Sequence, residues 1–140
     1  MARVLVVDDD PLVGKAIHSM LVANGHTVIV ADGGRAALPA LETFAFDVVM
    51  VDIVMPDING LDIIKIVREG ASDVGIVAMS GYAFDGGSSD RDYFHLAQKF
   101  GANRCLQKPF KPRDLIDAIE ACRDIARRSR IDLDGDRLNA

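Results

Sequence analysis

Cysteine is scarce in this chain, which holds only Cys105 and Cys122 among its 140 residues. The two fit no metal-binding spacing and no disulfide framework, so we expect a reducing compartment. A long apolar run is also missing at the N-terminus, where the sequence MARVLVVDDD reaches carboxylates after only four consecutive apolar residues. Such a run is too short for a signal peptide or a membrane span, which predicts a cytoplasmic protein with no membrane partner.

An excess of positive charge is absent as well. The chain has 16 Lys and Arg residues against 21 Asp and Glu residues, for a formal net charge of −5. This balance repels phosphate backbones and predicts no direct nucleic-acid partner. With 49% hydrophobic and 26% charged residues, the composition excludes wholesale disorder. The length suits one globular domain and leaves no room for a separate DNA-binding or catalytic module.

Five short runs rich in β-branched residues alternate with longer amphipathic segments. Most of the runs lack polar alternation, which is typical of strands buried on both faces of a parallel sheet. The segments between them carry apolar residues at helical spacing, such as Ile17 with Leu21 and Leu115 with Ile119. This alternation predicts an α/β fold built on a doubly wound parallel sheet. The predicted strands are residues 3–7, 27–31, 47–52, 75–80 and 104–107.

Three segments depart from the regular pattern. Pro39 lies in the second helical segment, and since a proline past the first turn costs up to about 3 kcal/mol, we expect a short or irregular helix there. Residues 81–92 are rich in Gly, Ser and Asp and are predicted to form a long loop. Residues 129–140 show no apolar stripe, so we expect a loosely held C-terminal tail after a domain at 1–128.

Polar side chains collect at the predicted carboxyl ends of the strands. Asp8 and Asp9 follow the first strand, and Asp52 ends the third. If these strands are neighbours, the three carboxylates converge, and they stay ionised together only if a cation joins them. Their oxygen atoms fit a hard divalent ion, for which we expect Mg²⁺. Ser80 and Lys108 follow the fourth and fifth strands and add a hydroxyl and a positive charge to the same crevice.

Four motifs, in this order and spacing, carry a family resemblance: VVDDDP, VVMVDIVMPDING, AMSG and LQKPF. Together they resemble the receiver domain of two-component response regulators over about residues 3–127. The resemblance implies a flavodoxin-like receiver fold with a five-stranded parallel sheet of order 2-1-3-4-5 and five flanking helices. It also implies a cis peptide bond between Lys108 and Pro109. On this basis we interpret the chain as a stand-alone, single-domain receiver.

The resemblance implies a role for each polar residue at the strand ends. Asp52 would accept a phosphoryl group, Ser80 would donate a hydrogen bond to that group, and Lys108 would pair with its oxygens. Mg²⁺ would be the cofactor. The implied metal ligands are Asp8, Asp9, Asp52 and the backbone carbonyl of Val54.

The implied partners are a histidine kinase or a histidine phosphotransfer protein as donor, and a downstream protein target. The chain would then act as a signalling protein and not as an enzyme. Two alternatives stay open. A pseudoreceiver would keep the fold and serve as an unphosphorylated scaffold. A phosphatase would use an aspartyl phosphate intermediate, but such enzymes commonly carry a second Asp two residues after the nucleophile, where Val54 stands.

One residue departs from the family pattern. Many receivers place an aromatic residue three positions before the lysine, where this chain has Cys105. A thiol side chain is much smaller than an aromatic ring, so we do not expect the usual aromatic switch. We expect the segment at 81–100 to carry the phosphorylation-dependent surface change instead.

Overall fold

The predicted strands form one parallel sheet in the computed structural model, which describes residues 1–70, 73–81 and 88–139. The strands follow one another as β2-β1-β3-β4-β5, which is the expected order, and every neighbouring pair runs parallel. Only the third strand differs from its predicted range, by one residue at its start. The bounds are β1 Arg3–Val7, β2 Thr27–Ala31, β3 Val48–Asp52, β4 Gly75–Ser80 and β5 Arg104–Gln107.

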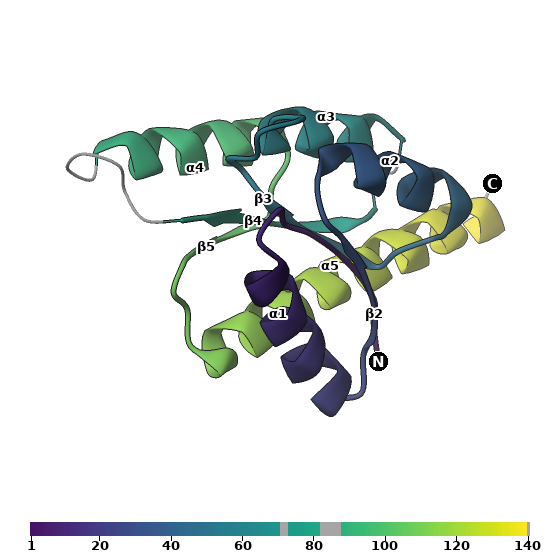
Figure 1. Cartoon of the computed structure of the whole chain (residues 1–140). Coiled ribbons are helices and arrows are strands. Elements are labelled where there is room, and N and C mark those ends of the chain that lie inside the picture. The colour runs from purple at the N-terminus through teal and green to yellow at the C-terminus, as the bar shows by residue number, and fades with distance from the viewer. Residues whose placement is uncertain (71–72, 82–87, 140) are drawn as a thin grey trace.

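Five helices in the described residues cover both faces of this sheet (Figure 1). Their bounds are α1 Pro11–Ala23, α2 Gly34–Thr43, α3 Gly60–Gly70, α4 Ser88–Phe100 and α5 Pro112–Asn139. Helices α1 and α5 pack on one face, and α2, α3 and α4 pack on the other. The architecture is therefore a three-layer, doubly wound α/β fold, as the sequence predicts.

Two hydrophobic cores lie on opposite sides of the sheet, because successive side chains of a strand point to opposite faces. Leu5 and Val7 of β1 pack toward α2 and α3, whereas Val4 and Val6 pack toward α1 and α5. All five residues of the central strand β3 are buried. This double burial explains why the strand sequences show no polar alternation.

Helix starts and ends follow the punctuation of the sequence. Asp10 caps α1, since its side-chain Oδ1 accepts a hydrogen bond from the backbone N–H of Leu12 at 3.0 Å, and Pro11 occupies the first helical position. Gly25 adopts a φ of 85° directly after the C-cap of α1, a backbone conformation that favours glycine. These local signals start α1 at the sheet edge that bears the acidic residues and end it at the opposite edge, where β2 begins.

Helix α2 contains Pro39, for which the sequence predicts a short or irregular helix. With ten residues, α2 is the shortest helix that the structure describes, and the helix continues past the proline. Pro39 and Arg35, four residues before it, are both exposed. The carbonyl that loses its helical partner can therefore bond to water, which lowers the cost of the proline.

Two sequence expectations need correction. Helix α4 begins at Ser88, so residues 88–92 are helical and the predicted loop at 81–92 is too long, while 82–87 lie outside the described residues. Ser and Asp at the start of this segment suit the first turn of a helix as well as a loop. The expected tail is also helical, because α5 runs on across residue 128 to Asn139. No proline interrupts residues 129–139, and each added helical residue gains a backbone hydrogen bond.

Candidate functional site

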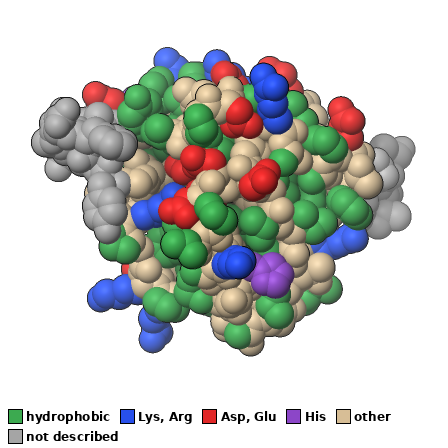
Figure 2. Space-filling model, in the orientation of Figure 1, with side chains coloured by type: hydrophobic (Ala, Val, Ile, Leu, Met, Phe, Trp, Pro, Cys, Tyr) green, Lys and Arg blue, Asp and Glu red, His purple; other side chains and the backbone are tan. Residues whose placement is uncertain are grey.

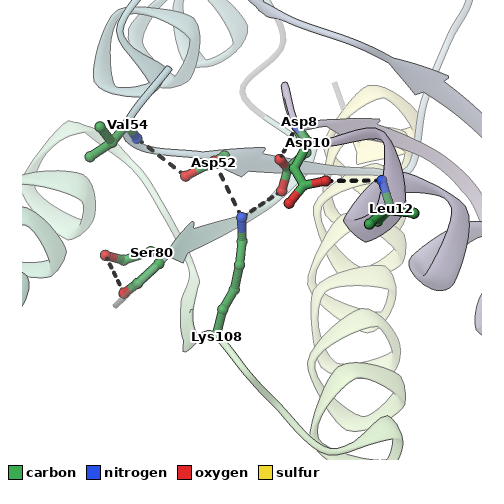
Figure 3. Close-up of polar contacts among 8 residues, drawn as sticks. Asp8, Asp10, Leu12, Asp52, Val54, Ser80 and Lys108 are labelled. Carbon is green, nitrogen blue, oxygen red and sulfur yellow. Dashed lines mark hydrogen bonds and ion pairs between the residues drawn. The ribbon is translucent and has the colours of Figure 1, made fainter. Parts of the chain in front are cut away.

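The candidate site lies at the carboxyl edge of the sheet, where the three central strands and β5 end side by side (Figure 3). Asp8 follows β1, Asp52 is the last residue of β3, and Ser80 is the last residue of β4. Lys108 follows β5 and reaches back across the edge toward the two aspartates. Parallel pairing brings these residues to the same place, because the carboxyl ends of parallel strands all lie at one edge of the sheet.

The three predicted carboxylates do converge. Asp8, Asp9 and Asp52 each offer an oxygen, and these atoms all lie within 4.8 Å of one another. Asp8 and Asp52 are buried residues, at 1% and 5% exposure, whereas Asp9 is exposed. In the space-filling view, acidic side chains gather near the middle of this face with basic side chains beside them (Figure 2). The cluster is thus a partly buried acidic cup that opens to solvent on one side.

Lys108 supplies the positive charge inside this cup. Its Nζ lies 2.6 Å from Asp8 Oδ2 and 3.2 Å from Asp52 Oδ2, so one ammonium bridges two carboxylates (Figure 3). Burial by itself lowers the pKa of Lys108, but the hydrogen bond to Asp8 and the charge of Asp52 outweigh it and raise the pKa. Lys108 therefore remains charged at neutral pH.

Asp52 is held in an environment that disfavours its ionised form. Burial raises the pKa of this carboxyl, and the charge of Asp8 raises it further. The charge of Lys108 and a hydrogen bond from the backbone N–H of Val54, at 3.2 Å from Oδ1, act in the opposite direction, but the pKa stays above its ordinary value. A further cation in the cup would relieve this cost.

The donor set fits Mg²⁺. Three carboxylates offer hard oxygen ligands within a few ångströms, and the exposed side of the cup leaves access for water, several molecules of which Mg²⁺ usually retains. The raised pKa of Asp52, which burial and the charge of Asp8 cause, shows that Lys108 alone does not fully offset burial and repulsion. The residues present are therefore suited to a divalent ion.

Ser80 and Val54 lie at the rim of the cup. Ser80 is 3% exposed, and its hydroxyl donates to the carbonyl of Gly81 at 3.4 Å (Figure 3). Val54 contacts Asp52 through its backbone N–H, while its side chain is half exposed. The predicted role of the Val54 carbonyl as a metal ligand stays a prediction. The expected cis peptide bond between Lys108 and Pro109 is present.

Sequence reasoning missed the backbone contacts of the site. The N–H of Asp10 donates to Asp8 Oδ1 at 2.9 Å, which fixes the orientation of the Asp8 carboxylate (Figure 3). Asp57, in the loop after β3, was likewise not singled out, although it fastens that loop to another element. Backbone donors leave no trace in residue types, so only the folded chain reveals these contacts.

Cys105 lies in β5 and faces α4. The thiol is partly buried, and its Sγ lies 3.9 Å from the carbonyl oxygen of Phe94. Burial raises the pKa of the Cys105 thiol, which keeps it protonated at neutral pH. The expected lack of the usual aromatic switch stays a prediction, as does the role of residues 81–100, of which 82–87 lie outside the described residues. No helix among the described residues is long and apolar enough to cross a membrane.

A doubly wound sheet of order 2-1-3-4-5 with an acidic cup and a lysine at its carboxyl edge defines the class of receiver-type signalling domains. The chain belongs to the response regulator receiver domain family, whose family model matches residues 4–120. Proteins of this family take their phosphoryl group from histidine kinases and bind Mg²⁺ in an acidic pocket. The family assignment confirms the resemblance read from the four motifs.

Individual relatives agree with the family. The chain is 33% identical over 118 residues to the response regulator protein FleR of Pseudomonas aeruginosa, covering 84% of this chain and 24% of FleR. It is 32% identical over 119 residues to the DNA-binding response regulator MtrA of Mycolicibacterium smegmatis, covering 85% of this chain and 49% of MtrA. The chain thus spans half or less of these relatives, and the expected absence of a nucleic-acid partner stays a prediction.

Solved structures show the same fold. A response regulator receiver domain protein from Clostridium thermocellum superposes with a TM-score of 0.80 at 28% identity, over 94% of this chain and 99% of that one. NtrX from Brucella abortus superposes with a TM-score of 0.86 at 25% identity, over 95% of this chain and 29% of that one. The five-stranded, five-helix architecture is therefore the receiver fold.

Proposed function

We propose that this chain is a phosphoacceptor of a two-component phosphorelay, in which a phosphoryl group passes from a phosphohistidine to Asp52 with the help of Mg²⁺. The donor would be a histidine kinase or a histidine phosphotransfer protein. One observation carries the proposal: Asp52 closes a three-carboxylate cup while its Oδ2 lies 3.2 Å from the ammonium of Lys108. A nucleophile flanked by a cation and a cation-binding site is what attack on an anionic phosphoryl group requires.

The transfer balances as a displacement at phosphorus. A carboxylate oxygen of Asp52 forms a bond to phosphorus, the bond between phosphorus and the histidine nitrogen breaks, and the imidazole leaves with the electron pair. Lys108 shifts from the carboxylates to the phosphoryl oxygens, and the Ser80 hydroxyl turns to donate to another of them. Asp8, Asp9, Asp52 and the Val54 carbonyl would hold Mg²⁺, whose positive charge would offset the repulsion between donor and acceptor.

Phosphorylation would change the surface that a partner protein meets. A singly charged carboxylate becomes an acyl phosphate of about two negative charges, and such a group draws nearby donors toward itself. The hydroxyl of Ser80 donates to the neighbouring Gly81 carbonyl at the long distance of 3.4 Å, and a phosphoryl oxygen is a stronger acceptor that would compete for this donor. Movement of Ser80 would move the end of β4, so a local change at the site would alter the surface that a partner protein contacts.

Two other functions compete with this one. A scaffold that never accepts phosphate has no need of the acidic cup, the acceptor and the lysine in one place, yet all three are present. A phosphatase with an aspartyl phosphate intermediate commonly needs an acid two residues after the nucleophile, and Val54 has no titratable side chain. The site geometry therefore favours the phosphoacceptor.

Labelling of the purified chain by a small radioactive phosphodonor tests the proposal. We expect up to one phosphoryl group per chain in the presence of Mg²⁺, and none after chelation or in Asp52→Asn. Asp32→Asn is the matched control, because Asp32 is an exposed carboxylate that directly follows β2 at the same sheet edge. Absence of labelling in the unmodified chain would support the scaffold, and release of many phosphates per chain each minute would support the phosphatase.

A further inference from the structure

The loop that joins β3 to α3, residues 53–59, carries the Val54 peptide and is fastened at each end. At its base, the N–H of Gly60 donates to the carbonyl of Ile53 at 2.8 Å. Within the loop, the N–H of Val54 donates to Asp52 Oδ1 at 3.2 Å. At the far side, Asp57 binds a different helix altogether. Two sets of hydrogen bonds therefore hold the backbone that faces the phosphoacceptor: the Gly60–Ile53 bond and the bonds from Asp57 to α2.

Asp57 caps α2 from a distance of more than twenty residues in sequence. Its Oδ1 accepts from the N–H of Gly34 at 3.1 Å, and its Oδ2 accepts from the N–H of Arg35 at 2.9 Å. Gly33, the N-cap residue of α2, has no side chain to do this. The backbone hydrogen bonds, led by those from Arg35 and Ile58, lower the pKa of Asp57, so the carboxylate stays ionised at neutral pH.

The loop and the start of α2 approach closely, and position 34 leaves no room for a Cβ. A Cβ at position 34 would lie 2.6 Å from Cβ of Ile58, and a Cβ at position 33 would lie 2.9 Å from Asp57 Oδ2. Real Cβ atoms essentially never approach another atom within 3.0 Å. The loop and the helix are therefore in close contact, with Gly33 and Gly34 on one side and the Asp57–Ile58 segment on the other.

We propose that Asp57 is a positioning residue for the phosphoacceptor site, and this inference rests on the function proposed above. By holding the loop against the N-terminus of α2, Asp57 keeps the Val54 peptide facing Asp52. The N–H of Val54 then orients the acceptor carboxylate, and the carbonyl of the same residue is available to Mg²⁺. The carboxylate oxygens of Asp57 accept hydrogen bonds from α2, so Asp57 acts on the site only through the loop.

Hydrogen exchange of the Val54 amide in the metal-free chain tests the inference directly. In Asp57→Ala we expect this amide to exchange about tenfold faster than in the unmodified chain, the factor that corresponds to loss of a typical hydrogen bond. Amides at the centre of β3 report global unfolding and must change less than Val54. Asp47→Ala is the matched control, because Asp47 Oδ2 also accepts a backbone N–H, from Arg3 at 2.8 Å, but at the opposite end of the sheet.

A second variant displaces the same loop while leaving the Asp57 side chain unchanged. Gly34→Ala should push Ile58 away from α2 and raise Val54 exchange in the same direction. Titration with Mg²⁺ alone, followed by amide chemical shifts, should show affinity about tenfold weaker in Asp57→Ala, as for other residues that orient metal ligands. Asp57→Asn keeps one acceptor oxygen, so its Val54 exchange rate and its Mg²⁺ affinity should lie between those of Asp57→Ala and those of the unmodified chain.

The outcomes separate this inference from the proposed function. Faster exchange at the first turn of α2 with no change at Val54 would make Asp57 a helix cap only and overturn the inference. Equal Mg²⁺ affinity in Asp57→Ala and the unmodified chain would do the same. If the unmodified chain accepts no phosphoryl group, the proposed function fails, but Val54 exchange still decides whether Asp57 positions the loop.

Discussion

At the scale of single residues, Asp52 is ionised at a cost to the folded state. Its pKa is raised chiefly by burial and also by the charge of Asp8, so ionisation is less favourable in the folded chain than in the unfolded one. In the presence of a chelator, we expect Asp52→Asn to raise the unfolding temperature by about 3 °C, since a buried repulsion is removed. Calorimetry measures this change, with exposed Asp32→Asn as the control that should leave the unfolding temperature unchanged. A lower unfolding temperature for Asp52→Asn would show that the pair with Lys108 outweighs the burial.

His26 gives the fold a pH dependence of its own. The side chain is buried, and its Nδ1 accepts the N–H of Ala2 at 3.0 Å, so a proton on Nδ1 would break this contact. Burial lowers the pKa of His26 below 6.5, helped by the charges of the N-terminal amine and Arg123 and opposed by that of Glu120. Because the unfolded chain binds the proton more readily, stability is full above pH 6.5 and falls as the pH drops below it.

Urea unfolding at pH 7.5 and 5.5 measures the contribution of His26. We expect the unmodified chain to lose more free energy of unfolding on acidification than His26→Asn, which keeps an acceptor but does not titrate in this range. The matched control is His18→Asn, since His18 is exposed on α1 and its replacement should retain the full pH dependence. Equal losses in the unmodified chain and in His26→Asn would contradict this assignment.

At the scale of elements, Arg68 joins α3 to the start of β4 and to the turn between α4 and β5. Its guanidinium donates to the carbonyl of Val74 at 2.8 Å, to that of Gly101 at 2.6 Å and to Asn103 Oδ1 at 3.1 Å. Gly101 has a φ of 125°, and a Cβ there would lie 2.8 Å from Arg68 Nε, so the turn is fitted to the arginine. One side chain thus fixes where three elements meet at the amino edge of the sheet.

Replacement of Arg68 should therefore loosen α3 from α4. We expect Arg68→Met to lower the free energy of unfolding by about 2 kcal/mol, because three acceptors lose a charged donor. Lys65→Met on the same helix is the control, since the Lys65 ammonium lies 4.1 Å from the centre of the Phe100 ring and such exposed contacts contribute about 0.5 kcal/mol. Urea denaturation compares the two, and similar losses would mean that the guanidinium contacts add little.

At the scale of the whole molecule, the proposed Mg²⁺ binding would be linked to folding, because the acidic cup exists only in the folded chain. Its carboxylates come from β1 and β3, whose residues are 44 positions apart in the register of the sheet, as for Val4 and Val48. Saturating Mg²⁺, at about 100 times its dissociation constant, should stabilise the fold by about 2.7 kcal/mol. Removal of the metal should return the unfolding temperature to its starting value.

Thermal unfolding with and without Mg²⁺ checks this linkage. The shift should shrink strongly in Asp9→Asn, which removes the exposed carboxylate of the cup, and a sodium salt of matched ionic strength should produce little of it. An undiminished shift in both Asp9→Asn and Asp52→Asn would place the ion elsewhere on the molecule.

Much of this protein follows from its sequence, because the relevant forces act locally. The β-branched runs define the five strands to within one residue, and Asp10–Pro11 marks the start of α1, since burial on two faces and helix capping depend on neighbours in the chain. The candidate site residues at the strand ends could be named in advance, because the carboxyl ends of parallel strands all lie at one edge of the sheet.

Only the tertiary structure decided how those residues face one another. The bridge from Lys108 to Asp8 spans 100 positions, and the anchor from Asp57 to Gly34 spans 23, so no local pattern encodes either contact. The length of α5 and the start of α4 were also misjudged from sequence, because helix propagation competes with loop formation at polar residues. Residue types set which elements form and which groups can react; distances between groups, and the pKa values that depend on them, arise only when the sheet closes.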